Sequence, residues 1–87
     1  MSASHLLKLL EPLAEMEHER WAHWQRYLHS KCSRNDDGSL TIPNELVVRW
    51  ERQIKTPYHN LTEAEKESDR EQVMGYLKFI INNIGLD

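Results

Sequence analysis

The chain has 87 residues and carries 11 Lys and Arg against 14 Asp and Glu, which gives a net charge of −3. This length predicts a single domain spanning residues 1–87, with a modest core and little chain left for a deep catalytic cleft. The hydrophobic content of 39% and the three Trp are typical of a folded domain rather than a disordered segment. Only three Gly and three Pro argue against an all-β fold, which needs many turns.

The sequence gives no sign of a membrane span or a secretory signal. The longest apolar run is Phe79-Ile80-Ile81, far shorter than the ~18 residues that a membrane span needs. No basic segment precedes the leucines near the N-terminus, so a secretory signal is not expected. Cys32 is the only cysteine, which excludes an intrachain disulfide and favours a cytoplasmic location.

Helical periodicity begins close to the N-terminus. Pro12 should interrupt it, because proline is tolerated in the first turn of a helix but not in its interior. We therefore predict a short helix near 5–10 and a long helix over about 12–31. The apolar stripe expected on the long helix consists of Leu10, Ala14, His18, Trp21 and Leu28, with Trp24 beside it.

A polar segment over 33–39 follows, and we interpret it as an exposed loop. Its Asp37-Gly38 dipeptide is a turn signal that could form the tip of a hairpin, but no strand-like run precedes it.

A second helix is predicted over about 43–55, with Pro43 at its start. Its end is set by Pro57, which disfavours helical backbone at the preceding residue. The apolar stripe of this helix is Leu46, Val47, Trp50 and Ile54.

The last helix, predicted over about 62–84, has the clearest start. Thr62 and Glu65 match a capping box, in which each side chain binds the backbone amide of the other residue. Gly85 is placed to end the helix. Its apolar face consists of Val73, Leu77, Ile80, Ile81 and Ile84, with Met74 at the edge. The prediction is an all-α domain, orthogonal or bundle-like, with three main helices and a short N-terminal one.

Polar residues lie on or beside the predicted apolar faces. His18 falls on the core side of the long first helix, while Asp69 and Arg70 flank the apolar face of the last helix. Because buried polar groups need partners, we expect His18 to pair with Asp69 and Glu19 with Arg70. Two interpretations stay open. The cluster is either a structural polar clamp between two helices or a pocket for a small anion or ligand, lined by His18, Arg70 and Trp21.

The sequence lacks the residue sets that enzymes and metal proteins use. His18 and His23 are five residues apart, whereas a zinc-binding His-Glu-x-x-His motif places its histidines four apart on one helix face. His29 and Cys32 are only two potential ligands, so no metal or other cofactor is predicted. No nucleophile–base pair or phosphate-binding Gly-rich loop is evident, and we predict that the protein is not an enzyme.

The charges are distributed unevenly along the chain. Residues 20–34 are basic and contain aromatic side chains, a combination that can bind single-stranded nucleic acid. These aromatic residues follow helical spacing, however, and the net charge is negative, so the sequence argues against nucleic-acid binding.

Two blocks of the sequence resemble the RyR domain, a family named for the repeats of ryanodine receptor calcium channels and also found as small domains in bacteria and phages. The first block is His18-Glu19-Arg20-Trp21. The second runs from Pro57-Tyr58 through Glu63-Ala64-Glu65-Lys66 to Asp69-Arg70. The segment 43–55 departs from the receptor repeats, which carry a Gly-Trp segment there. The chain therefore looks like a divergent, short bacterial or phage-type member.

The resemblance implies a compact helical domain without established enzymatic activity, which senses small ligands, nucleotides among the candidates. The positions that match the family pattern are His18, Glu19, Trp21, Tyr58, Asp69 and Arg70. The expected function is thus that of a non-catalytic module that binds a small anionic ligand or a protein partner. The alternative is a homodimeric interaction protein whose polar cluster is purely structural.

Overall fold

The computed structural model describes residues 2–85 and confirms the predicted all-α class, since 76% of the chain is helical. The order of elements is α1 (Ala3–Leu7), α2 (Leu10–Lys31), β1 (Ser33–Arg34), β2 (Leu40–Thr41), α3 (Asn44–Lys55), the 3-10 helix η1 (Tyr58–Asn60) and α4 (Glu63–Ile84). Among these described residues, no helix is both long and apolar enough to cross a membrane.

The break between α1 and α2 lies at Lys8 and Leu9, slightly earlier than the sequence predicts. Pro12 occupies the first turn of α2, where its missing N–H is not needed. A continuous helix would bring the proline ring against the carbonyl of Lys8, four residues earlier. The chain turns at this point, and the amide of Leu9 donates to the carbonyl of Leu6 at 2.9 Å.

The segment predicted as a loop contains a minimal antiparallel hairpin. β1 and β2 pair Ser33 with Thr41 and Arg34 with Leu40. Between them, Gly38 adopts a left-handed conformation with φ 88°, and its amide donates to the carbonyl of Asn35 at 3.0 Å. The turn signal of Asp37-Gly38 is therefore used for a hairpin. The strands are only two residues long, so no alternating apolar pattern could reveal them in the sequence.

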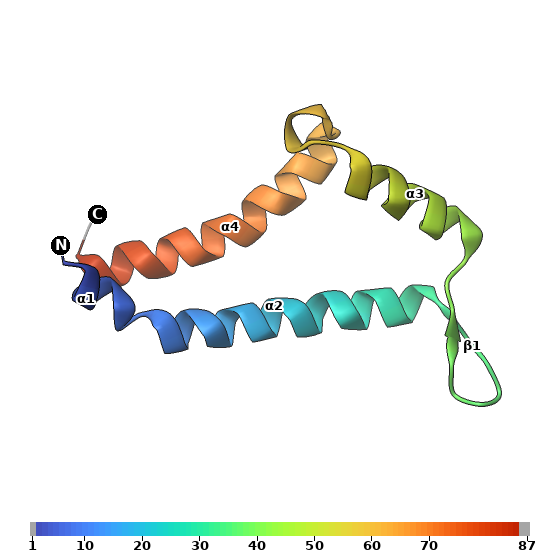
Figure 1. Cartoon of the computed structure of the whole chain (residues 1–87), viewed down its shortest axis with the longest axis horizontal. Coiled ribbons are helices and arrows are strands. Elements are labelled where there is room, and N and C mark those ends of the chain that lie inside the picture. The colour runs from blue at the N-terminus through green and yellow to red at the C-terminus, as the bar shows by residue number, and fades with distance from the viewer. Residues whose placement is uncertain (1, 86–87) are drawn as a thin grey trace.

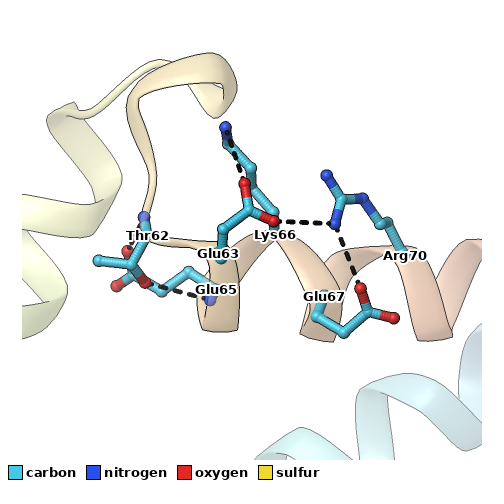
Figure 2. Close-up of polar contacts among 6 residues, drawn as sticks. All are labelled: Thr62, Glu63, Glu65, Lys66, Glu67 and Arg70. Carbon is cyan, nitrogen blue, oxygen red and sulfur yellow. Dashed lines mark hydrogen bonds and ion pairs between the residues drawn. The ribbon is translucent and has the colours of Figure 1, made fainter.

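α4 begins and ends as predicted. The hydroxyl of Thr62 accepts from the amide of Glu65 at 3.2 Å, and the Glu65 carboxylate accepts from the amide of Thr62 at 3.0 Å (Figure 2). Arg52 of α3 donates to the same carboxylate at 2.6 Å, which ties α3 to the start of α4. The Thr62 amide, and then Arg52, hold the pKa of Glu65 below its usual range. Gly85 closes the helix in a left-handed conformation with φ 76°.

The three long helices form an open triangle rather than a closed bundle (Figure 1). α2 and α4 approach each other at the corner where α1 lies, and they diverge toward α3, which closes the third side. The radius of gyration is 17.4 Å, whereas a compact chain of this length would have about 12 Å. The chain is therefore much more extended than a typical domain of its size.

This arrangement leaves few side chains buried. Within the described residues the buried hydrophobic side chains are Leu9 and Leu46 alone. Several residues that the sequence assigns to apolar stripes are exposed, among them Ile54 of α3 at 77% and Trp21 of α2 at 57%. Trp50 and Leu28 are half-buried and face the inside of the triangle. Leu10, Ala14 and His18, which the sequence places on the same stripe of α2, are exposed as well, so the expectation that this stripe faces a core is wrong.

α4 shows this difference most clearly. Its predicted apolar face includes Val73 and Leu77, which are 51% and 45% exposed. The side that faces α2 carries instead polar and aromatic residues, including Gln72 and Tyr76. The expectation that Val73 and Leu77 lie in the core is thus wrong for the single chain, because Leu77 lies on the outer side of α4 and Val73 lies between that side and the side that faces α2.

The capping box yields a test of how much α4 depends on local interactions. Thr62→Ala removes the hydroxyl that caps the helix and should cost about 1 kcal/mol, which lowers the melting temperature by roughly 4–8 °C for a domain of this size. Thr56→Ala is the matched control, because its hydroxyl bonds only to the carbonyl of Arg52 within α3. Thermal unfolding followed by circular dichroism measures both, and equal losses in the two variants would contradict the capping role.

Candidate functional site

The main concave feature is a cleft inside the triangle, between α2, α3 and α4. Its volume is about 660 Å³, within the range of small-molecule sites. α2 contributes six residues, α3 two and α4 five, so the cleft exists only when the three helices are placed together. The residues that line it are Glu17, Arg20, Trp24, Gln25, Tyr27, Leu28, Trp50, Gln53, Ser68, Asp69, Gln72, Val73 and Tyr76.

The lining combines flat aromatic rings with neutral hydrogen-bonding groups. The aromatic rings are those of Trp24, Tyr27, Trp50 and Tyr76, from all three helices. Trp24 and Tyr27 pack edge to face, with ring centroids 5.7 Å apart. Three glutamines and Ser68 add donors and acceptors that carry no net charge. Such a surface suits a planar ligand that has polar groups along its edges.

A polar link across the cleft joins α2 to α4. The hydroxyl of Tyr76 donates to the Glu17 carboxylate at 2.8 Å, and Arg20 forms an ion pair with the same carboxylate. Arg20, and then Tyr76, hold the pKa of Glu17 below its usual range. Desolvation, and then the hydrogen bond to Glu17, raise the pKa of the Tyr76 hydroxyl. Among residues 2–85, this link is the only hydrogen bond that joins a side chain of α2 to a side chain of α4.

The sequence did not predict this link, because its spacing favoured His18, one residue further along α2, for the contact with α4. His18 and Glu19 both lie on exposed positions of the helix. The ring of His18 stacks on that of Trp21 of the same helix, with centroids 5.9 Å apart. The expected pairs His18–Asp69 and Glu19–Arg70 are not formed, because α2 turns Glu17 and Arg20 toward α4 instead.

The other predicted residues lie on α4 and η1. Arg70 donates to Glu67 at 3.2 Å and to Glu63 at 3.3 Å, so its partners lie on its own helix (Figure 2). Glu67, and then Glu63, raise the pKa of Arg70. Tyr58, Asp69 and Arg70 line a second groove on the outer side of α4, and Asp69 also borders the cleft.

The six predicted residues therefore fall into two groups. His18, Glu19 and Trp21 lie on α2, while Tyr58, Asp69 and Arg70 border the outer groove of α4. No single cavity contains both groups among the described residues, and Asp69 alone lines the central cleft. Periodicity could have identified Tyr76 as facing the same side of α4 as Asp69, since they are seven residues apart.

Across residues 2–85, no group of three or more His, Cys, Asp or Glu side chains could hold a metal ion. The thiol of Cys32 donates to the carbonyl of Leu28 at 3.2 Å, a contact within one turn.

Comparison of the chain with protein-family models, curated proteins and solved structures found no match.

The Glu17 link predicts a specific dependence of stability on pH. Because its pKa is lowered, Glu17 contributes stability above the usual glutamate pKa of about 4.3, and this contribution is lost as pH falls through the lowered value. Glu17→Gln should therefore melt below the wild type near neutral pH, and the difference should shrink as the pH falls below the usual glutamate pKa of about 4.3.

Glu19→Gln is the matched control, since Glu19 is exposed on the next position of α2 and takes no part in the link. The Glu19→Gln variant should melt like the wild type near neutral pH and in acid. Melting curves recorded across the acid range test this, and a Glu17→Gln difference that stays constant with pH would contradict the assignment.

Proposed function

We propose that this protein is a small, non-catalytic helical module that binds a planar, polar small molecule in the cleft between α2, α3 and α4. The observation that carries the proposal is the lining of that cleft, where aromatic rings and neutral amide groups from three helices converge on one volume of about 660 Å³. Aromatic stacking and hydrogen bonds at the ligand edge are the interactions that such a site provides.

The charges of the cleft narrow the class of ligand. One cation, Arg20, faces two carboxylates, Glu17 and Asp69, and Glu17 already pairs with Arg20. The cleft therefore has no surplus of positive charge to receive a phosphate-rich group. It favours a heterocycle such as a nucleobase, with any phosphate directed toward solvent. This differs from the anion pocket around His18 and Arg70 that the sequence suggests.

A small-ligand function agrees with what the resemblance to RyR domains of bacterial or phage type implies, namely sensing of small ligands with nucleotides among the candidates. The cleft itself is a different site from the one that the resemblance implies, because of the six matching positions only Asp69 lines it. A cytoplasmic location, favoured by the single cysteine, fits a module that meets free nucleosides and nucleotides. Under this proposal the protein reports the presence of the ligand to a partner and performs no chemistry on it.

A thermal-shift screen against nucleobases, nucleosides, mononucleotides and cyclic nucleotides tests the proposal. A ligand at 1 mM that binds with a micromolar dissociation constant stabilises the folded state by about 4 kcal/mol, which corresponds to a rise in melting temperature on the order of 10 °C or more. The absence of a shift with every compound would contradict the proposal.

A matched pair of variants locates the site once a compound gives a shift. Gln72→Leu removes an amide from the wall of the cleft and should abolish most of the shift. Asn82→Leu makes a similar change on an exposed position of α4 that does not line the cleft, and the shift should remain. Loss of the shift in both variants, or in neither, would place the ligand elsewhere.

A further inference from the structure

The surface of this chain is much larger than that of a folded monomer of the same mass. Its accessible area is 7069 Å², whereas a compact protein of 10.4 kDa exposes about 5,400 Å². The excess, roughly 1,700 Å² by the same scaling, consists largely of surface that a closed domain would bury. Obligate homodimers bury about 1,000–2,500 Å² on each subunit, so one further chain could cover an area of this size.

Three of the exposed large apolar side chains lie together on the outer side of α4, whereas the others are spread over α1, α2, α3 and the connecting segments. The three, Val73, Met74 and Leu77, line the apolar part of a groove of about 500 Å³. These three side chains are each about half exposed. Tyr58 extends the groove toward η1, and its ring, 49% exposed, lies under the ammonium of Lys66 at 5.9 Å. The groove is distinct from the central cleft, with which it shares only Asp69 and Val73.

The spacing of the apolar residues on α4 indicates what kind of surface would cover them. Val73, Leu77, Ile80 and Ile84 follow one another at intervals of four, three and four residues. This is the spacing with which two helices of like sequence pack side chains of one into the spaces of the other. We call these four residues the α4 seam. Val73 and Leu77 are exposed in the single chain, while Ile80 and Ile84 are half-buried.

We propose that a second copy of this chain covers the α4 seam, so that two α4 helices pack against each other across a two-fold axis. A two-fold contact uses the same patch on both subunits, and the seam meets that condition because each helix supplies the same regularly spaced apolar side chains.

The mass of the full-length protein in solution tests this proposal directly. Light scattering or sedimentation over about 1–100 µM, which detects dissociation constants of about 100 µM or tighter, should give twice the 10.4 kDa of one chain at the upper end of this range. A mass of one chain throughout this range would overturn the proposal, and so would a trimer or higher assembly.

Two variants identify the surface that carries the contact. Leu77→Arg places a charge in the α4 seam and should raise the dimer dissociation constant about 100-fold or more, because two leucine side chains lose their burial in each dimer. Ile54→Arg is the matched control, since Ile54 is the more exposed of the two at 77% and lies on α3, away from the seam. It should leave the dimer intact.

A third measurement covers the case in which Leu77→Arg does not fold. Hydrogen exchange of the wild-type protein, compared between high and low concentration, should show protection of α4 amides that weakens on dilution, because a bound partner stabilises the folded state by mass action. A wild-type dimer whose mass is unchanged by Leu77→Arg but halved by Ile54→Arg would place the contact on α3 and overturn the assignment to α4.

Discussion

The scarcity of buried apolar surface is the constraint on which the rest of this structure depends. Leu9 and Leu46 are the buried hydrophobic side chains of residues 2–85, so packing within one chain contributes little to holding the helices together. The helices are placed instead by contacts at their ends and along a single polar link. The Thr62–Glu65 cap with Arg52 defines the corner between α3 and α4, and Tyr76 connects α4 to α2 through Glu17.

α4 is the element on which both proposals meet, because its two sides differ in character. The side toward α2 carries Gln72 and Tyr76 and forms one wall of the cleft, while the opposite side carries Met74 and Leu77 on the outer groove. Asp69 borders both cavities. A ligand that orders the inner side would therefore act on the same helix that contacts the second chain, which gives ligand binding a direct physical route to the dimer contact.

The local structure was largely predictable, and the candidate site was not. The capping box at Thr62 and the end of α4 at Gly85 depend on neighbouring residues only, and both were predicted correctly. The hairpin at Gly38 was missed because strands of two residues have no periodicity to detect. The pairing of His18 with Asp69 was not found, since it depended on a rotation of α2 that periodicity does not define.

The sequence by itself determined the helices, their ends and the amphipathic character of α4, because caps, prolines and side-chain spacing act within a few residues. Only the tertiary structure decided which faces turn inward. It placed Glu17 rather than His18 against α4, and it left Leu77 on the outside. The physical reason is that an apolar stripe requires burial but does not say against which surface, and in this chain the inner faces of the triangle are occupied by aromatic and amide side chains.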